Sequence, residues 1–525
     1  MSCNQRPSQN IAFYMDIGNE PSSLHPINQP FDGAAVRVRE KVLETLVKNS
    51  LETYDWEPSL ATSWEISEDK LTFIFKLRED VYWHDGEKFT AEDVKFSFDA
   101  FFDENFNGAA MRPLLDGIKK VEIIDEYTVK FIAKDAYYKN FDTAAGLDIL
   151  PKHFYEQKGK SKGFFNKNLV GTGPYKLDIY KRGNRVVLKR NDKWWGFKDP
   201  ENKQHNFEKI VQRFVSNSNV NIEMLKKGSL DFVGMSPEMY MKRTSGPEWG
   251  TKVHKVKTKN KSPKGYNFIG WNLKHPILKD RMVRKALYHL VNRKLMVEKF
   301  EYGLSEPAVG PVYHSSPYHD QSLKPIEYDP KLALKILRNR GWSDSDGDNI
   351  LDKVIDGKKM KFSLTLLEPS ETFLKYDTVF KEDARKVGVE LNIKQIEWNS
   401  FVKLLDERKF DAVRLAWSAS VDWDPKQIWH SDSINGGSNF ISYSNPKLDK
   451  IIEEVRYEHD REKRIEKLKV AERIIVNDYP YIWFTYKDIV LYGHTDRIKK
   501  EKDSLNYSVG TTYWDFKSKM RKEAY

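Results

Sequence analysis

The sequence has almost no cysteine. Its 525 residues include one, Cys3, which has no second cysteine with which to form an intramolecular disulfide. Cys3 follows Ser2 in a polar opening segment, MSCNQRPSQN, for which we predict a flexible tail over residues 1–10. The segment lacks the apolar core of a secretory signal. Two interpretations stay open: a processed lipoprotein whose signal peptide has been removed and whose Cys3 carries a lipid tether, or an incidental thiol.

Long hydrophobic runs are also missing. No window approaches eighteen consecutive apolar residues, so no membrane-spanning helix is expected. With 39% hydrophobic residues, 31% charged residues and a mean hydropathy of −0.67, the composition indicates a globular rather than a disordered chain. Because 525 residues exceed what one hydrophobic core usually spans, two or three lobes are expected.

The sequence lacks a long run of charge of one sign. Lys and Arg number 87 against 77 Asp and Glu, a formal net charge of +10, but the two signs are interspersed along most of the chain. No nucleic-acid-binding motif is present. The pattern predicts a solvated basic surface and no nucleic-acid partner.

Catalytic motifs are absent: there is no GxSxG, P-loop, HExxH or CxxC. One stretch, WHDGEKFTAEDVKFSF (83–98), resembles a site because His84 stands beside Asp85, and a peptidase is the alternative from another function class. However, Thr90 and Asp93 have the spacing of a helix capping box, and His84 lacks a second ligand at metal spacing. We therefore predict a strand, a turn and a capped helix here, no catalysis and no cofactor.

Strand and helix patterns alternate between residues 360 and 418. Three segments have the pattern of strands: KFSLTLL, VELNIKQIEW and FDAVRLAWS. The two segments between them have the pattern of helices: ETFLKYDTVFKEDARKV and NSFVKLLDERK. This order predicts a parallel sheet with right-handed crossovers. Ligands of such sheets bind beyond the carboxyl ends of the strands, so the segment WSASVDWDP (417–425) is the candidate binding segment.

Two further helices are predicted in the second half of the chain. One begins at Pro330 and stops at Gly341. The other is a single long helix from near Asn445-Pro446 to just before Pro480.

The acidic loop after Gly341 resembles a calcium-binding loop. Asp344, Asp346, Asp348 and Asp352 occupy positions 1, 3, 5 and 9 of that pattern. Asn349 and Ile355 replace the glycine of position 6 and the bidentate glutamate of position 12. The loop is therefore predicted to be an acidic surface turn, with a weak calcium site as the alternative and no other metal expected.

Several long motifs, in order, resemble the bacterial extracellular solute-binding proteins of the peptide and nickel class (family 5), which serve ABC importers. They are GNEPSSLHPI (18–27), LATSWEISEDKLTFIFKLREDVYWHDGEKFTAEDVKFSF (60–98), VGTGPYKL (170–177), RNDKWWG (190–196), GYNFIGWNLKHPILKDRMVRKALYHLVNR (265–293) and NPKLDKIIEEVRYEHDREKR (445–464).

The resemblance implies an α/β, three-lobed periplasmic binding protein fold of type II with an extra inserted lobe. Lobe I would comprise residues 11–47, 170–263 and 490–525, lobe II residues 48–169, and lobe III residues 264–489. It further implies a ligand cleft between lobes I and III that closes by hinge motion. The expected protein is a monomer in the periplasm or on the outer face of the cytoplasmic membrane, and it delivers its ligand to an ABC transporter permease.

The family holds the ammonium of a peptide ligand with an acid in a Trp-x-Ala-Asp-Tyr-x-Asp-Pro motif. Trp417, Ala419, Asp424 and Pro425 match it, but Ser420 and Val421 replace the Asp-Tyr pair and one residue is inserted. Asp422 is the nearest candidate for the ammonium partner. The complete set of candidate ligand-binding residues is Asp32, Gly33, Ala34, Trp417, Ser418, Ala419, Asp422, Trp423 and Asn439.

An oligopeptide is the predicted ligand, because this family typically holds peptides by strand-like backbone hydrogen bonds. An oligosaccharide is the alternative within the same fold. Aromatic side chains such as Trp417 and Trp423 also stack against sugars, and the acid that pairs with an ammonium is displaced in this sequence.

Overall fold

The computed structural model describes residues 12–109 and 111–517, so Cys3 and the predicted tail lie outside the described residues. The described chain forms two compact units. Unit 1 takes the chain up to Asn260 and again from Val490, and unit 2 is Lys261–Ile489. The boundaries predicted for the three lobes stay a prediction.

Unit 1 contains a seven-stranded sheet in the order β12-β22-β11-β1-β10-β9-β8. Strand β1 runs parallel to β10 and β11, and the other neighbours are antiparallel. The strands are β1 (Ala12–Asp16), β8 (Tyr175–Lys181), β9 (Arg185–Arg190), β10 (Lys209–Arg213), β11 (Phe232–Gly234), β12 (Val253–Thr258) and β22 (Val490–Thr495). Three segments that are far apart in the chain therefore meet in one sheet.

A second sheet of unit 1 is antiparallel, with the order β4-β5-β7-β6. It consists of β4 (Ala61–Ile66), β5 (Thr72–Leu77), β6 (Ile118–Asp125) and β7 (Thr128–Ala133). The predicted strand LTFIFKL is confirmed as β5, and Phe73, Phe75 and Leu77 lie in the core. Alternate residues of a strand point to opposite faces, which explains why Lys76 between them is exposed.

Unit 1 is completed by short helices and two-stranded sheets. The helices are α1 (Gly33–Val42), α2 (Ala91–Asp99), α3 (Arg112–Leu115), α4 (Asn140–Ala145), α5 (Lys152–Tyr155), α6 (Lys162–Phe165), α7 (Ser218–Lys226) and α8 (Pro237–Lys242), with 3-10 turns η1 (Trp195–Lys198) and η3 (Thr511–Tyr513). The small sheets pair β2 (Val47–Asn49) with β3 (Trp56–Pro58), and β23 (Ile498–Lys499) with β24 (Asp515–Phe516).

The stretch 83–98 is part of this framework. The Thr90 backbone N–H donates to Asp93 Oδ2 (3.1 Å), which caps α2 as predicted. The same carboxylate accepts from Trp83 Nε1 (3.2 Å) and from the Lys152 backbone N–H (2.9 Å). His84 bridges to the loop before β8: its Nε2 lies 2.9 Å from the Gly173 carbonyl oxygen, and its Nδ1 accepts from the Gly171 N–H at 3.3 Å.

Unit 2 is built on a five-stranded sheet in the order β18-β17-β19-β13-β20. Its strands are β13 (Tyr266–Trp271), β17 (Ser363–Glu368), β18 (Glu390–Gln395), β19 (Ala412–Trp417) and β20 (Tyr481–Trp483). The predicted parallel set β17, β18 and β19 is confirmed. Strand β13 is antiparallel to both β19 and β20.

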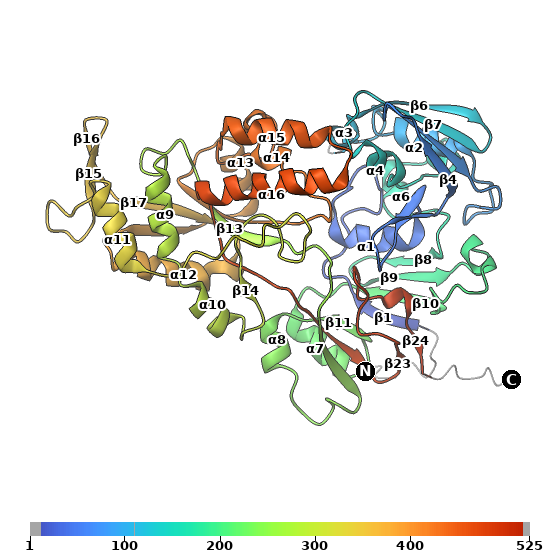
Figure 1. Cartoon of the computed structure of the whole chain (residues 1–525). Helices are drawn as coiled ribbons and strands as arrows, with labels where there is room; N and C mark the ends of the chain where they lie inside the picture. Colours follow the sequence, from blue (N-terminus) through green and yellow to red (C-terminus); the bar gives the residue numbers. More distant parts are fainter. Residues whose placement is uncertain (1–11, 110, 518–525) are drawn as a thin grey trace. The chain divides into compact units, whose positions relative to one another are not determined.

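The helices of unit 2 are α9 (Arg281–His289), α10 (Arg293–Phe300), α11 (Pro330–Asn339), α12 (Glu371–Arg385), α13 (Trp398–Asp406), α14 (Lys426–Trp429), α15 (Pro446–Arg456) and α16 (Arg461–Asp478), with the 3-10 turn η2 (Ser431–Ile434). Helix α11 confirms the prediction that placed Pro330 in its first turn. The single long helix predicted before Pro480 is wrong: it is two helices, α15 and α16, which lie side by side (Figure 1).

The helix breaks because Asp460 starts a new one. Its carboxylate accepts from the backbone N–H groups of Glu462 (3.0 Å) and Lys463 (3.1 Å), as an N-cap does. Continuing α15 would also place His459 and Glu462 on the face that Ile452 and Val455 bury, which would cost the hydration of two polar groups.

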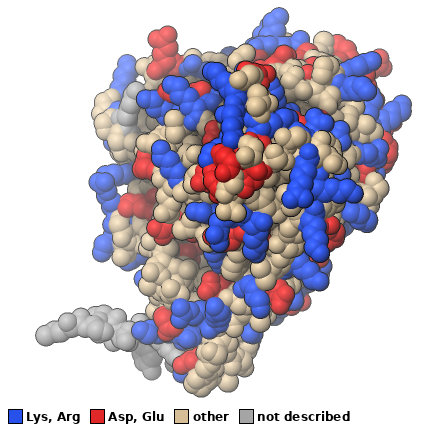
Figure 2. Space-filling model, turned by 90° about the vertical axis from the view of Figure 1, so that its left-hand side faces the viewer, with Lys and Arg blue, Asp and Glu red and all other residues tan. Residues whose placement is uncertain are grey.

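Two short hairpins complete unit 2. One pairs β14 (Glu306–Pro307) with β21 (Thr485–Tyr486), and the other pairs β15 (Asp352–Ile355) with β16 (Lys358–Lys361). The β15–β16 hairpin projects from the edge of the unit (Figure 1). Figure 2 shows Lys and Arg side chains interspersed with Asp and Glu on the face that it displays, as the sequence pattern predicts. Within residues 12–109 and 111–517, no helix combines the length and apolar character needed to cross a membrane.

The environment of His84 predicts a pH-dependent stability. Burial lowers the pKa of His84 to about 4, so the unfolded chain binds a proton there between about pH 6.5 and pH 4 while the folded chain does not. The contribution of His84 is therefore complete above pH 6.5 and is lost as the pH falls towards 4, by up to about 3 kcal/mol. Denaturant unfolding of wild type and His84→Ala over this range should show a shallower pH dependence in the variant. Parallel curves would contradict the assignment.

Candidate functional site

The predicted binding segment follows β19 directly. Trp417 is the last residue of this strand and lies opposite Tyr266 of β13. Its ring lies nearly parallel to those of Phe268 (6.4 Å between centroids, 17°) and Phe440 (6.1 Å, 10°). Trp417 is partly exposed, so this aromatic stack combines a supported ring with a surface that a ligand can reach.

Asp422 is held from a distant part of unit 2. The hydroxyl of Tyr318, a fully buried residue, donates a hydrogen bond to Asp422 Oδ1. Burial and the neighbouring Asp422 charge both raise the pKa of Tyr318, so the phenol stays neutral. The Ser420 hydroxyl donates to the Asp422 carbonyl oxygen (2.6 Å) and closes the turn. These two contacts orient the Asp422 side chain and its turn.

Asp424 is in a different position. Its Oδ2 accepts from Arg456 Nη1 of α15 at 2.8 Å, and its Oδ1 accepts from the Lys426 backbone N–H at 2.9 Å, at the start of α14. The charge of Asp424 is therefore paired, and both oxygens hold the turn. Asp424 therefore serves the turn, and Asp422 remains the candidate partner for a ligand cation.

The other residues predicted around β19 differ in exposure. Ser418 is exposed, Ala419 and Trp423 are partly exposed, and Trp423 packs against the hydrophobic core of unit 2. The structure therefore brings Trp417, Ser418, Ala419, Asp422 and Trp423 together in one loop at the carboxyl end of β19.

Asn439 does not share this exposure. It is fully buried, its amide nitrogen donates to the carbonyl oxygens of His430 (3.0 Å) and Tyr443 (2.8 Å), and its oxygen accepts from the Tyr443 N–H (2.9 Å). Gly437 beside it allows close packing within the unit, because a Cβ there would lie 2.6 Å from Ser433 Cβ. The Asn439 side chain therefore holds its own loop, and we leave it out of the proposed ligand contacts.

Asp32 of unit 1 caps a helix. Its Oδ1 accepts from the N–H groups of Ala34 and Ala35 (3.0 Å each), and its Oδ2 accepts from the Ser22 N–H (2.7 Å) and hydroxyl (2.6 Å). Partial burial raises the pKa of Asp32, but these hydrogen bonds outweigh it and hold the pKa below its ordinary value. The carboxylate is saturated by its own helix and loop, while Gly33 is exposed and Ala34 partly exposed.

A pocket of about 350 Å³ lies beside Ser22, and its polar residues are not among those predicted from sequence. Glu20 lines it and joins two segments: its carboxylate accepts from the Tyr180 hydroxyl (2.9 Å) and from the Gly183 N–H (2.9 Å). Arg182 also lines the pocket. The motif GNEPSSLHPI, which contains Glu20 and Ser22, was the sequence signal that could have found it.

Sequence reasoning also missed Arg414, three residues before Trp417. Its side chain is fully buried, its Nη2 donates to Asn267 Oδ1 (2.8 Å), and its guanidinium carbon lies 3.6 Å from the Phe484 ring centroid. Asp377 Oδ1 lies 3.5 Å from Arg414 Nε. The buried Arg414 therefore holds β19 to its neighbours inside unit 2.

The acidic loop brings Asp344, Asp346 and Asp348 close together on the surface, with ligand atoms within 4.8 Å of one another. Two lysines of β16 balance them: Lys359 Nζ lies 3.0 Å from Asp346, and Lys361 pairs with Asp348. Asp344 Oδ1 and Oδ2 accept from the N–H groups of Gly347 (2.8 Å) and Asn349 (3.0 Å).

Asp352, the fourth acid of the calcium pattern, starts β15 and is buried. Its carboxylate accepts from the Ser345 hydroxyl (2.7 Å) and N–H (3.0 Å). These contacts describe a self-contained acidic turn.

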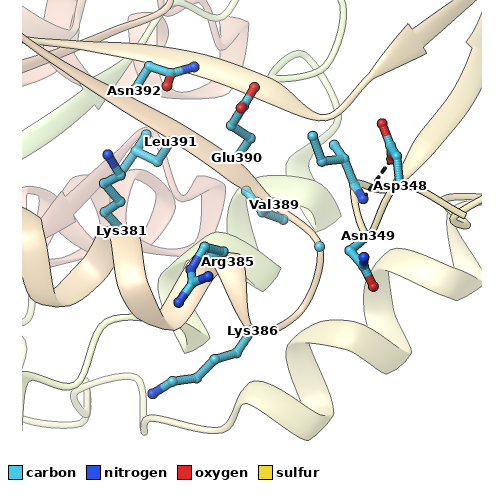
Figure 3. A pocket seen from close by; sticks show the side chains of 11 residues that line it. Asp348, Asn349, Lys381, Arg385, Lys386, Val389, Glu390, Leu391 and Asn392 are labelled. Atoms are coloured by element: carbon cyan, nitrogen blue, oxygen red, sulfur yellow. Dashed lines mark hydrogen bonds between the residues drawn. The ribbon is translucent and has the colours of Figure 1, made fainter.

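An open groove of about 630 Å³ adjoins this turn (Figure 3). It lies between the end of α12, with Lys381, Arg385 and Lys386, and β18, with Glu390 and Asn392. Two of its three named cations have partners in the chain: Lys386 pairs with Asp383 (2.7 Å), and Arg385 with Glu382 (3.0 Å). Neighbouring groups thus satisfy these two cations, which makes the groove a weaker candidate than the loop after β19.

Comparison with known proteins identifies the family. The model of the bacterial extracellular solute-binding proteins, family 5 Middle, matches residues 55–439, more than half of the chain. The chain belongs to this family. The predicted α/β periplasmic binding protein fold is confirmed, and the family is one of solute-binding proteins outside the cell.

Relatives of known name are similar over most of the chain. The oligopeptide-binding protein AppA of Bacillus subtilis (strain 168) is 27% identical over 92% of this chain and 87% of its own. The nickel-binding periplasmic protein of Escherichia coli (strain K12) is 26% identical over 86% of this chain and 84% of its own.

Solved structures share the fold. AppA from Bacillus subtilis in complex with a nonapeptide superposes with a TM-score of 0.76 at 24% identity, covering 97% of this chain and 100% of that one. NikA from Brucella suis in complex with Fe(III)-EDTA gives a TM-score of 0.80 at 22% identity, covering 96% and 100%. The same fold therefore holds both peptides and metal chelates.

Because lysines already pair with the acidic loop, we predict that calcium does not change the stability of the protein. Unfolding temperatures measured in excess chelator and in millimolar calcium should agree within error, because a cation would have to displace Lys359 and Lys361. A saturable rise in the unfolding temperature with calcium, the sign of binding to the native state alone, would contradict the acidic-turn assignment. Asp346→Asn provides the matched control, since it should abolish any such rise.

Proposed function

We propose that this protein captures oligopeptides and delivers them to the permease of an ABC importer. The observation that carries the proposal is Asp422, a carboxylate held by the neutral hydroxyl of buried Tyr318 at the end of β19. A peptide ammonium that leaves water needs an anionic partner. Asp422 supplies one, and its orientation is set before the ligand arrives.

The aromatic residues beside Asp422 support the same proposal. Trp417 is stacked on Phe268 and Phe440, so its ring is already ordered and loses little conformational entropy when a ligand covers its exposed part. Ser418 and Ala419 provide strand-end backbone next to it, and an extended peptide can pair with such backbone. The peptide-bound relative AppA supports this choice of ligand class.

We further propose that the protein has no catalytic activity. The two residues of the peptidase alternative have structural partners: His84 bridges the backbone of Gly171 and Gly173, and Asp85 Oδ2 lies 2.9 Å from His153 Nε2. The same proposal includes a monomer, a location in the periplasm or on the outer face of the cytoplasmic membrane, and a lipid tether at Cys3. It also includes Trp423 as a ligand contact.

The ligand class can be tested on the protein as purified. Native mass spectrometry of protein prepared without added ligand should show a ladder of bound masses that matches peptides. Masses spaced by a hexose unit would instead identify the oligosaccharide alternative and contradict the peptide proposal. Denaturation of the same sample should release the ligands for direct sequencing.

Asp422→Asn removes the proposed ammonium partner while keeping the hydrogen bond from Tyr318. An unpaired buried charge costs about 3–5 kcal/mol, so the affinity for a peptide with a free N-terminus should fall by roughly a hundredfold or more. Calorimetric titration with free and N-acetylated forms of one peptide should show the preference for the free form shrinking in the variant.

Asp424→Asn is the matched control. Because Asp424 pairs with Arg456 and caps the turn, its loss should lower the unfolding temperature while the preference for the free N-terminus remains. Equal binding of both peptide forms to wild type, together with unchanged affinity in Asp422→Asn, would show that Asp422 does not pair with an ammonium.

A further inference from the structure

Unit 1 contains a second open pocket, remote in sequence from the loop after β19, that the function above does not use. Its volume is about 760 Å³, within the range of about 300–1,000 Å³ usual for small-molecule sites. Residues from β2, β3, η1 and η3 line it, together with the segment 199–204. We call it the Trp195 groove.

The Trp195 groove has an ordered aromatic wall. Glu44 accepts from the indole nitrogens of both Trp194 (3.0 Å) and Trp195 (3.1 Å). Burial raises the pKa of Glu44 to about 7, although hydrogen bonds from the two indoles lower it. The guanidinium carbon of Arg78 lies 3.9 Å from the Trp195 ring centroid, and Arg78 Nε donates to the Ser59 carbonyl oxygen (2.7 Å). The wall is therefore positioned before any ligand binds.

Tyr513 forms an exposed part of the lining. It is 42% exposed, and its hydroxyl accepts from Gln204 Nε2 at 2.9 Å, which fixes the ring in place. A partly exposed ring with a hydrogen-bonded tip offers apolar contact at low entropic cost. The Trp195 groove thus combines an open aromatic face with polar neighbours.

The ionic groups of the groove balance one another. The lining contains four cations and four anions: Lys48, Arg78, Lys198 and Lys203, and Glu57, Asp80, Asp199 and Glu201. Lys198 and Asp80 form an ion pair at 2.7 Å. A lining without net charge does not select an anion or a cation of high charge.

Four of these groups remain available to a ligand. Within residues 12–109 and 111–517, the side chains of Lys48, Lys203, Glu57 and Glu201 make no hydrogen bond or ion pair within the distances that define one. Lys48 and Glu57 are nevertheless opposite each other in the β2–β3 ladder. The groove therefore offers unpaired donors and unpaired acceptors together. Hydroxyl groups, which both donate and accept, can satisfy such a mixture.

We propose that the Trp195 groove binds a neutral oligosaccharide through Tyr513 and the Lys48–Glu57 ladder pair. A sugar ring has an apolar face of C–H groups and a rim of hydroxyls. The C–H face can pack on the aromatic face of the groove, and the hydroxyls can bond to its balanced polar groups. The four cations and four anions of the lining balance, so the groove has no net negative charge that would favour a peptide ammonium over a neutral ligand. The site is separate from the peptide proposal and does not depend on it.

The test is calorimetric titration of the full chain with cellotetraose, maltotetraose and chitotetraose, each up to about 10 mM. Saturable binding of at least one is expected. Tyr513→Ala should weaken that binding about fivefold, the order that one aromatic contact contributes. Tyr82→Ala removes another exposed ring of unit 1 (56% exposed) and should leave it unchanged. Peptide affinity should be the same in all three proteins.

A second variant guards against misfolding of Tyr513→Ala. Glu57→Gln keeps size and shape but removes the acceptor charge, and it should also weaken the oligosaccharide. No binding of any of the three sugars would overturn the proposal. Sugar binding that survives both variants but is lost in Trp417→Ala would also overturn it, because the sugar would then occupy the loop after β19. Stronger binding of inorganic phosphate than of the sugars would overturn the assignment of a neutral ligand.

Discussion

The geometry of unit 2 depends on a buried positive charge. Arg414 lies in β19 with no exposed side-chain surface, so its guanidinium must be compensated inside the protein. Burial raises the pKa of Glu368 to about 8, and Asp377 adds to this effect. Burial also raises the pKa of Asp377, whereas Arg414 lowers it. Burial of two neighbouring carboxyls therefore favours a shared proton, and the pair faces the buried Arg414 guanidinium.

This balance ties together elements that are distant in the chain. Asp377 comes from α12 and Glu368 from the end of β17, while Arg414 also donates to Asn267 of β13. Removing one member of such a buried set costs about 3–5 kcal/mol, so β19 has one position relative to its neighbours. Because the loop that begins at Trp417 follows β19 directly, its start is held in the same place.

Two further contacts hold the loop after Trp417. Tyr318 donates to Asp422, and Arg456 pairs with Asp424. The loop is thus supported by the strand behind it, by a buried segment of unit 2 and by α15. A binding group that is already ordered loses less entropy when its ligand arrives, which raises affinity without additional contacts.

Periodicity made the framework predictable. The alternating strands and helices between β17 and β19 have local patterns of apolar residues, and the structure follows them. The break between α15 and α16 was missed because the composition stays helical throughout. The signal was a change of phase: Leu448, Ile452 and Val455 face the core in α15, but the next buried apolar residues, Ile465 and Leu468, do not continue that spacing.

The site was harder to predict because an aspartate has several uses. Asp32 and Asp422 were both candidates from sequence. However, both carboxylate oxygens of Asp32 accept hydrogen bonds, one from the start of α1 and the other from Ser22. Asp422 and Asp424 are two residues apart and chemically identical. Contacts from distant parts of the chain hold both of them: the Tyr318 hydroxyl, 104 residues away, for Asp422, and the Arg456 guanidinium, 32 residues away, for Asp424. No local pattern contains this information, since it arises only when the chain folds. The contacts of a carboxylate are therefore a property of tertiary structure, and a role in binding an ammonium can be proposed only once those contacts are known.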